Sequence, residues 1–255
     1  MLGGILSVLA ASVFLVLPFQ QRQRLLPHLV SFATGALLGA AFLALLPHAL
    51  TSNSITDPHT ITQAVLVGLL VFFLMEKMVL WRHCHTIECE VHTPDDMQEH
   101  HHHHHGEPSS GILVLVGDAF HNFVDGVLIA AAFMSDIELG IVTALAVAAH
   151  EIPQEVGDFA ILLQSGFSRA KALFFNILSS LTTVLGGVLA YWGLSEVQHF
   201  LPYVLAIAAS SFIYVAVADL IPGLHKRTEL AVSIQQVSLM FAGVLTIYMA
   251  HTYLH

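Results

Sequence analysis

Apolar residues without charge occur in eight runs along the chain, each about as long as the hydrocarbon core of a bilayer is thick. These runs cover 2–19, 29–50, 61–81, 111–134, 139–164, 170–193, 201–222 and 231–253. The pattern predicts an all-α integral membrane protein with eight transmembrane helices, in which residues 1–255 form a single polytopic membrane domain. The first run lacks the preceding basic residues of a cleaved signal peptide, so we expect it to be a retained span.

The composition agrees with this prediction. Only 10% of the 255 residues are charged and 56% are hydrophobic, whereas about 25% of the residues of a soluble protein are charged. Lys and Arg number 8 against 18 Asp and Glu, so the chain lacks the basic surface that nucleic acids require. We expect the lipid bilayer as a partner and no nucleic acid, and we exclude a soluble enzyme, a secreted disulfide scaffold and a disordered chain.

The basic residues indicate how the helices are oriented. They fall at alternate connections: Arg22, Arg24, Lys77, Arg82, Arg169, Lys171, Lys226 and Arg227. The connections at 51–60, 135–138 and 194–200 contain none. Because basic loops face the cytoplasm, we predict that the N and C termini lie outside and that the 82–110 loop is cytoplasmic. No targeting motif identifies the membrane, and we expect the plasma membrane, which is the inner membrane in a bacterium.

The second and seventh runs resemble each other. Residues 33–48 read ATGALLGAAFLALLPH and residues 208–223 read AASSFIYVAVADLIPG, with Pro47 and Pro222 in register. The predicted topology makes these two helices run in opposite directions, and inverted repeats are common in transporters. We therefore expect an inverted repeat that flanks the fourth and fifth helices.

The fourth and fifth helices are polar at mid-depth. GDAFHNFVDG and HEIPQEVGDF contain Asp118, His121, Asn122, Asp125, His150, Glu151, Gln154, Glu155 and Asp158. Spacings of three, four and seven place such residues on one face of each helix, and the short connection makes the helices antiparallel neighbours. An ionised carboxylate near a helix centre costs about 2.5–3.5 kcal/mol, and neither helix contains Lys or Arg. Protons, water or bound cations must compensate, and carboxylates converging with imidazoles suit a divalent transition metal, above all zinc.

Polar residues in a membrane helix can also serve only to join helices by hydrogen bonds. That explanation suits a single Asn or His better than nine polar residues on two adjacent helices. Pro153 can be a simple kink, or it can expose a backbone carbonyl to the site because it lacks an N–H. Gly126 and Gly157 are expected to allow close helix approach.

An intramembrane zinc protease or hydrolase is the main alternative, because HEIPQ is similar to the HExxH helix in which two His bind zinc. Gln154 replaces the second His, however, and Pro153 disturbs the one-turn spacing between the ligands. A hydrolase also leaves the carboxylates that continue to Asp158 unexplained. A channel or carrier for a larger solute does not fit these ligands, so the residues favour a metal transporter and not an enzyme.

Two motifs resemble the ZIP family of divalent-metal transporters. Residues 121–126, HNFVDG, are similar to the family's fourth-helix motif HNxxDG, and residues 150–158, HEIPQEVGD, are similar to its fifth-helix motif HExPHExGD. The likeness extends over the whole chain, to eight spans, outward termini and a His-rich third loop. Pro47, His48 and Asp219 also stand at positions that resemble family positions.

The resemblance implies import of zinc into the cytoplasm by alternating access, within a homodimer, with cadmium, iron or manganese as alternative substrates. It also implies a binuclear site between helices four and five, with up to two ions per chain. One ion would use His121, Asp125, His150 and Gln154, and the other Asn122, Asp125 and Glu151. Gln154 departs from the motif, which has His or a carboxylate there, and Glu155 beside it could compensate. The route to and from the site would use His48, Asp118, Asp158 and Asp219.

The 82–110 loop contains nine of the 18 histidines. Its candidate metal ligands are His83, Cys84, His85, Cys89, His92, His100, His101, His102, His103, His104 and His105. Tracts rich in His and Cys bind metals, and a reducing cytoplasm favours free thiols or metal ligands over a disulfide. We predict a metal-binding loop that buffers or senses arriving metal; the alternative is a linker whose His residues are dispensable.

Overall fold

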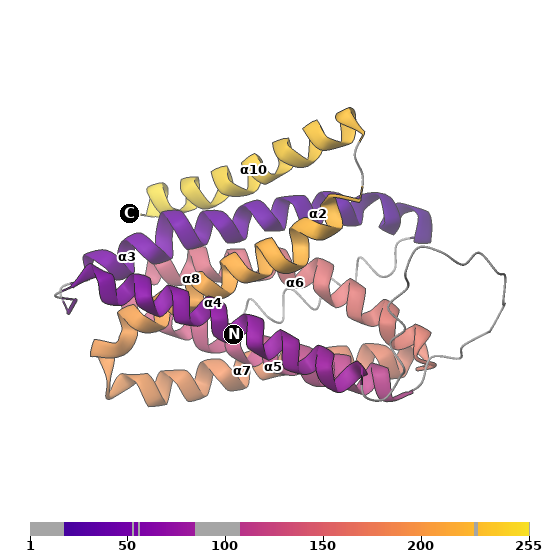
Figure 1. Cartoon of the computed structure of the whole chain (residues 1–255), viewed down its shortest axis with the longest axis horizontal. Coiled ribbons are helices and arrows are strands. Elements are labelled where there is room, and N and C mark those ends of the chain that lie inside the picture. Colours follow the sequence, from indigo (N-terminus) through magenta and orange to yellow (C-terminus); the bar gives the residue numbers. More distant parts are fainter. Residues whose placement is uncertain (1–17, 53, 56, 85–107, 227–228, 255) are drawn as a thin grey trace.

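The structure is a computed structural model, which describes residues 18–52, 54–55, 57–84, 108–226 and 229–254 (Figure 1). Every regular element among these residues is a helix: α2 (Phe19–Gly39), η1 (Ala40–Leu45), α3 (Leu46–Thr51), α4 (Pro58–Cys84), α5 (Pro108–Ser135), α6 (Ile137–Gln164), α7 (Arg169–Ser195), η2 (Gln198–Phe200), α8 (Leu201–Tyr214), η3 (Val215–Leu220), α9 (Ile221–Leu224) and α10 (Leu230–Leu254). The all-α prediction is therefore confirmed for the described part of the chain.

Six segments of the described chain are long and apolar enough to cross a membrane: Gln20–Thr51, Pro58–Met78, Gly111–Ser135, Arg169–Ser195, Gln198–Leu224 and Leu230–Tyr253. They correspond to six of the eight predicted spans. Helix α6 is not among them because the polar residues of HEIPQEVGD lower its hydropathy, although it has 28 residues like α5. Almost all of the remaining predicted span, at 2–19, falls outside the described residues.

Two helices extend beyond the apolar runs that predicted them. Helix α2 begins directly after Pro18, well before the expected start at residue 29, so Arg22 and Arg24 lie in the helix and not in a loop. Helix α4 likewise continues to Cys84. Hydropathy marks where the chain is apolar, whereas helical hydrogen bonding continues through polar residues.

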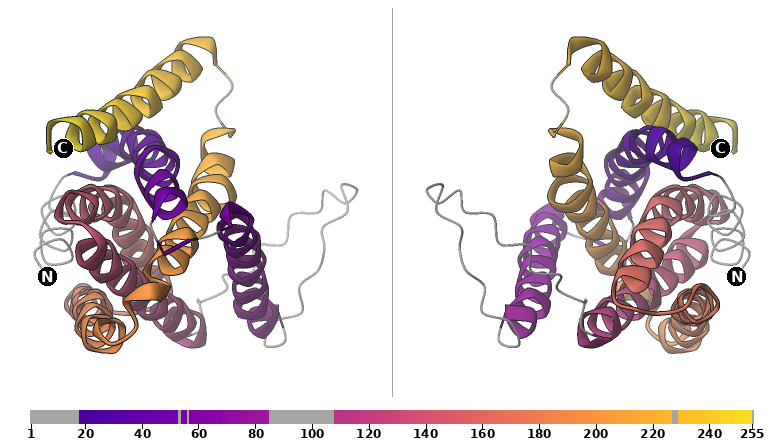
Figure 2. Two further views of the ribbon diagram at one scale, coloured as in Figure 1. Left: turned by 90° about the vertical axis from the view of Figure 1, so that its left-hand side faces the viewer. Right: turned by 90° about the vertical axis from the view of Figure 1, so that its right-hand side faces the viewer.

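The antiparallel helices α5 and α6 are surrounded by other helices on several sides. Helix α7 packs along α5, helix α2 packs against α6, and helix α8 contacts α5. Helices α4 and α10 lie at the periphery, where α4 packs mainly on α8 and α10 mainly on α2 (Figure 2). This arrangement places the polar faces of α5 and α6 inside the bundle.

Helices α5 and α7 approach until their backbones touch. A Cβ added at Gly126 would overlap the carbonyl oxygen of Thr183, and one added at Gly186 would overlap the carbonyl oxygen of Phe123. The expectation of close approach is confirmed for Gly126. It is wrong for Gly157, where an added Cβ meets no described atom within 4 Å because this residue does not face a neighbouring backbone.

The helices that contain Pro47 and Pro222 share a local irregularity. Each has a π-helical turn, η1 or η3, that ends two residues before its proline. Proline has no N–H, and its ring crowds the carbonyl one turn earlier. The N–H of Leu46 therefore bonds to Ala41 O, five residues back, and the turn before Pro222 repeats this bond. Figure 1 shows that the two helices run in opposite directions across the bundle.

An apolar core fills the end of the bundle where α5 connects to α6. Leu45, Leu139, Val142 and Leu205 are at most 1% exposed there, and they belong to one contiguous cluster with side chains of α3, α6 and α8. These side chains close that end of the bundle.

Candidate metal site

Two residues of α5 and two of α6 bring metal-ligand atoms together. They are His121, Asp125, His150 and Glu151, whose ligand atoms all lie within 4.8 Å of one another. His150 Nε2 is 3.2 Å from both His121 Nε2 and Asp125 Oδ2. Glu151 Oε1 is 3.8 Å from each of the two Nε2 atoms. We call these residues the four-residue cluster.

The four-residue cluster is almost completely buried. Asp125, His150 and Glu151 are at most 2% exposed, whereas the His121 side chain is 21% exposed. Neither carboxylate oxygen of Asp125, nor Glu151 Oε1, accepts a hydrogen bond from a described residue. No Lys or Arg lies on α5 or α6. Buried carboxylates are costly unless a cation compensates them, so the cluster has the chemistry of a cation site.

The His150 ring is held in one orientation. Its Nδ1 lies 3.2 Å from Ala146 O, one turn earlier on α6, and the ring packs edge-on against Phe212 with centroids 6.3 Å apart. When Nδ1–H donates to this carbonyl, Nε2 keeps the lone pair that a metal needs. Phe212 belongs to the apolar core and is 1% exposed, so it separates the cluster from that end of the bundle.

Asn122 and Glu155, two further expected ligands, bond to residues of α7. The Asn122 amide donates to the backbone oxygen and Oδ1 of Asp118, at 3.1 and 3.0 Å, and its Oδ1 accepts from the Thr183 hydroxyl at 2.9 Å. The Glu155 carboxylate accepts a hydrogen bond from the Ser180 hydroxyl. Asn122 and Glu155 are each 1% exposed, so these bonds are shielded from solvent.

Helix α7 thus supplies a polar face that apolar patterning alone does not reveal. Asn176, Ser180 and Thr183 have the spacing of one helix face, and the Asn176 amide donates to Glu155 O at 3.1 Å. The signal is present in the sequence as hydroxyl and amide residues at helical intervals within an apolar run. Ser and Thr are common where membrane helices pack together, so that signal indicates contact but not a role at a site.

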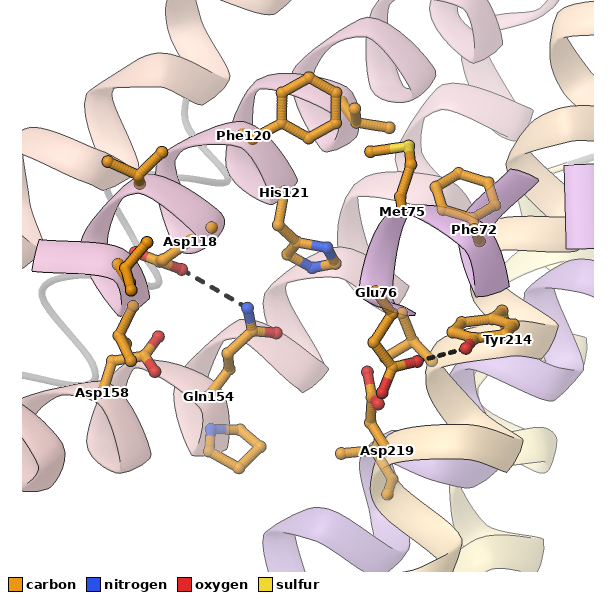
Figure 3. Close-up of a pocket in the computed structure, with 18 of the residues that line it drawn as sticks. Phe72, Met75, Glu76, Asp118, Phe120, His121, Gln154, Asp158, Tyr214 and Asp219 are labelled. Atoms are coloured by element: carbon orange, nitrogen blue, oxygen red, sulfur yellow. Dashed lines mark hydrogen bonds between the residues drawn. The ribbon is translucent and has the colours of Figure 1, made fainter. Parts of the chain in front are cut away.

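A cavity of about 730 Å³ reaches the cluster at His121 (Figure 3). On the side of α5 and α6 its polar lining residues are Asp118, Gln154 and Asp158, and across it are Glu76, Tyr214 and Asp219. The structure therefore brings three of the expected route residues, Asp118, Asp158 and Asp219, to one cavity.

Hydrogen bonds tie the polar residues on each side of the cavity. Gln154 Nε2 donates to Asp118 Oδ1 at 3.4 Å, so its amide is directed along the wall of the cavity. The Tyr214 hydroxyl donates to the Glu76 carboxylate across the α4–α8 contact. The sequence pattern singled out neither Glu76 nor Tyr214, because one carboxylate near the end of an apolar run and one Tyr in another resemble ordinary interfacial residues.

The remaining expected residues lie apart from the cavity. His48, near the end of α3, has its Nε2 2.8 Å from the hydroxyl of Ser135 at the end of α5. The side chains of His83 and Cys84, together with the ligands expected at 85–107, lie outside the part of the chain whose side chains the structure describes.

A bundle of membrane-length helices with two imidazoles and two carboxylates at its centre defines the class of polytopic membrane proteins that handle metal ions. Comparison with known proteins shows which member of this class it is. The family model described as "ZIP Zinc transporter" matches residues 1–250, and the chain belongs to the ZIP zinc transporter family. It is thus a multi-pass membrane protein of a transporter family and not an enzyme, and the comparisons give the hydrolase alternative no support.

Several relatives cover most of the chain. Zinc transporter ZIP13 of Pongo abelii is 33% identical over 231 residues, which are 86% of this chain and 65% of that protein. Zinc transporter ZIP13 of Danio rerio is 31% identical over 257 residues, covering 86% of this chain and 74% of its own. Human zinc transporter ZIP4 is 31% identical over 250 residues, covering 77% and 38% respectively. The chain therefore spans about two thirds of the first relative and much less of the last.

Proposed function

We propose that this protein carries divalent metal ions across a membrane through the four-residue cluster, with zinc as the principal substrate. The observation that carries the proposal is the convergence of four zinc-type ligand atoms within 4.8 Å at the bundle centre. Ionisable residues inside a membrane bundle mark ion pathways by default. Zinc is also the metal in the relatives' names. Cadmium, iron and manganese are alternative substrates because their ligand preferences overlap with those of zinc.

The cavity lies on one side of the cluster. Its lining includes Met78 on α4, Leu113 on α5, Asp158 on α6 and Leu220 in η3, and each stands in the half of its helix nearer the 82–110 loop. The apolar core and Phe212 close the other side. Basic residues assign that loop to the cytoplasm, so this conformation opens inward and supports metal import, with both termini outside.

Alternating access requires a second conformation that opens outward. The π-helical turns before Pro47 and Pro222 occur at matching positions in two helices of opposite direction, which supports an inverted repeat flanking α5 and α6. In transporters with such repeats, one part of the protein moves against the other around a central site. Breaks in regular helical bonding also give a helix a place to bend.

The route through the protein follows from these positions. His48 lies at the closed end, where a metal ion would enter, and its imidazole is a suitable first ligand. Asp118, Asp158 and Asp219 line the open cavity, where carboxylates would guide the ion out toward the cytoplasm. Glu155 stabilises the α6–α7 contact through Ser180 and stands next to Gln154 on the wall of the route.

The 82–110 loop would then meet metal as it arrives in the cytoplasm. Its His and Cys residues suit a buffering or sensing role. We expect deletion of residues 95–107 to leave transport largely intact, and loss of all zinc uptake would instead make the loop part of the pathway. A homodimer in the plasma membrane, which is the inner membrane in a bacterium, completes the proposal, and crosslinking in native membranes tests it.

Zinc uptake into proteoliposomes tests the proposed function. We expect His150→Ala and Asp125→Ala each to abolish saturable uptake or reduce it severely, because each removes a ligand that the other three cannot replace. His59→Ala is the control, since it removes an exposed imidazole far along the chain from the cluster. Unchanged uptake in both cluster variants, with the proteins folded and inserted, would exclude this site. Failure of the intact protein to move zinc, iron or manganese would overturn the proposed function.

A further inference from the structure

We infer that an acyl chain of an anionic membrane phospholipid enters the cavity between α4 and α5, with the lipid headgroup against Lys77. The inference concerns how the bilayer meets the cavity, so it does not rest on the proposed function. Its support is the apolar side of the cavity, the surface around the opening between the two helices, and the charge at the end near the 82–110 loop.

The cavity has an apolar side as well as its polar walls. Figure 3 shows Phe72, Met75 and Phe120 on a different side of the cavity from Asp118 and Asp158. Phe72 and Met75 belong to α4, and Phe120 belongs to α5. Water occupies polar cavities, whereas an apolar space stays dry and takes up apolar molecules. The side of the cavity that α4 and α5 form therefore suits hydrocarbon and not water.

This apolar side is continuous with the surface that faces the bilayer. On α5, the side chains of Ile112, Val116 and Phe120 are each at least 49% exposed, and their spacing places them in one stripe along the helix. Val116 and Phe120 line the cavity, whereas Ile112 does not. On α4, Leu74 and Met78 are each at least 50% exposed, and of these two only Met78 lines the cavity. Each helix thus continues its lipid-facing surface into the cavity.

The opening lies between two helices that pack mainly on other helices. Helix α4 packs mainly on α8 and α5 mainly on α7, and α4 and α5 have little contact with each other (Figure 2). Both contain membrane-length segments, so the medium beside the opening is the hydrocarbon of the bilayer. The cavity volume of about 730 Å³ lies in the range of sites that enclose a small ligand. An acyl chain of a neighbouring lipid can therefore enter without crossing water.

The charge beside the cavity favours an anionic headgroup. Lys77 is exposed, directly precedes the lining residue Met78, and lies in the last turn of the membrane-length segment Pro58–Met78. A Lys at this depth extends its ammonium group to the membrane surface, where it attracts anionic lipids. A phospholipid with one chain in the cavity would have its phosphate at the same depth. Lys77 is therefore placed to bind the headgroup of the lipid whose chain enters.

Quenching of tryptophan fluorescence by phosphatidylglycerol with brominated acyl chains tests the inference in vesicles. Trp81→Phe and Trp192→Phe remove the two native tryptophans, and Val30→Trp places a reporter on the α2 wall of the cavity. Phe241→Trp replaces a side chain that is 70% exposed on α10 and is the lipid-facing reference. Phe159→Trp replaces one that is 8% exposed and does not line the cavity, and is the shielded reference. We expect Val30→Trp to be quenched nearly as strongly as Phe241→Trp, and quenching no stronger than that of Phe159→Trp would overturn the inference, because water or another segment of the chain would then fill the cavity.

Filling the cavity from α5 tests where the chain enters. Gly117 lines the cavity, and an added Cβ there meets no described atom within 4 Å, so Gly117→Leu places its side chain in free space. We expect this change to lower the quenching of Val30→Trp to the level of Phe159→Trp. Gly157→Leu is the matched control, at an equally open position that does not line the cavity, and it should leave the quenching unchanged. Equal quenching in the two Leu variants would overturn entry between α4 and α5.

Lys77→Gln tests the headgroup contact. The relative binding of phosphatidylglycerol and phosphatidylcholine follows from the quenching of Val30→Trp in mixed vesicles in which either lipid is brominated. We expect the preference for phosphatidylglycerol to fall by about 5-fold in Lys77→Gln, because one Lys near the membrane surface contributes about this much to the binding of anionic lipids. Lys171→Gln removes an exposed Lys of α7 that does not line the cavity, and it should keep the preference. Equal preferences in the two Gln variants would overturn the role of Lys77.

Discussion

The side chains of His48 and Ser135 are 2.8 Å apart, between His48 Nε2 and Ser135 Oγ, and they join the end of α3 to the end of α5. This contact stands at the closed end of the bundle, beyond the apolar core that contains Leu45 and Leu139. The cavity opens at the opposite end. In an alternating-access mechanism, the His48–Ser135 bond therefore stabilises the conformation that is closed on the outer side.

Ser135→Ala should shift the equilibrium toward an outward-open conformation. A net hydrogen bond contributes about 1 kcal/mol, which corresponds to a factor of about 5 in population. Thr143 reports this shift, because it is completely buried and lies two turns from His150, in the half of α6 nearer the connection to α5. In a Thr143→Cys chain with Cys84→Ser and Cys89→Ser, we expect Ser135→Ala to raise the rate of alkylation from the outer side about 5-fold.

The Thr51→Val variant is the control for this experiment. Thr51 lies at the same end of the bundle, but the bonds of its hydroxyl to described residues go to Pro47 O and His48 O within its own helix. Its removal should leave the alkylation rate unchanged. If Ser135→Ala and Thr51→Val alkylate at the same rate as the parent, the His48–Ser135 contact does not control access.

Gly126→Ala should strongly destabilise the folded protein. The added Cβ would overlap the backbone of Thr183, and because backbone cannot move aside like a side chain, α5 and α7 must separate. Overpacking of this kind costs about 1–3 kcal/mol. Gly157→Ala makes the same change where an added Cβ meets no described atom within 4 Å, and a helical Gly→Ala change is otherwise favourable by up to about 1 kcal/mol.

Thermal unfolding of the detergent-solubilised protein measures the difference between these two variants. We expect a lower midpoint for Gly126→Ala and an equal or higher midpoint for Gly157→Ala. Equal midpoints would mean that the α5–α7 contact is looser than the structure shows.

These two glycines also show what the sequence can and cannot predict. Both occur in polar membrane helices, and nothing local distinguishes them. Helical spacing was sufficient to place His121 with Asp125 on one face of α5. The short connection makes α5 and α6 antiparallel neighbours, and this brings that face level with His150 and Glu151 of α6. Which glycine meets a backbone depends on how α7 packs on α5, and that arrangement is not encoded in any short segment.

Contacts between helices that are far apart in the sequence could not be predicted, for the same reason. Glu76 and Tyr214 meet because α4 packs on α8, and Thr183 meets Asn122 because α7 packs on α5. Each of these residues is unremarkable within its own apolar run. Helix ends were also misplaced, as in α2, because hydropathy records the membrane core and not the limits of helical hydrogen bonding.

Gln154→His should change the metal selectivity of transport. The Gln154 amide lies on the cavity wall and bonds to Asp118 Oδ1, so an imidazole there adds a softer ligand beside the path of the ion. Soft and borderline metals gain most from such a ligand. We expect zinc and cadmium uptake to rise relative to iron and manganese, by about 10-fold in the ratio of zinc to manganese.

Competitive uptake of the four metals into proteoliposomes measures this ratio. Gln164→His, the same change at an exposed position at the end of α6, is the control and should keep the parental profile. An unchanged profile for Gln154→His would show that residue 154 is peripheral to the path of the ion.

Tyr214→Phe should slow the release of metal to the cytoplasm. The hydroxyl of Tyr214 donates to Glu76, and its ring stacks on Phe72 with centroids 6.4 Å apart. Phenylalanine preserves the stacking and removes only the donor, so the Glu76 carboxylate becomes free to hold a cation in the cavity that it shares with Asp219. A hydrogen bond to a charged group contributes about 1.5–3 kcal/mol. Without this bond the Glu76 carboxylate holds zinc more tightly, so we expect the maximal rate of zinc uptake to fall by about 10-fold. The half-saturating zinc concentration should fall as well.

Tyr203→Phe makes the same change on the same helix, where the hydroxyl bonds to Thr60 Oγ1 at 3.4 Å and does not line the cavity. This control should retain the parental uptake rate. If Tyr214→Phe slows uptake while the half-saturating concentration rises, the hydroxyl helps to bind the ion and does not restrain Glu76. If the two variants transport zinc equally well, the Glu76–Tyr214 pair serves only to join α4 to α8, and the ion leaves past Asp118 and Asp158 on the other wall.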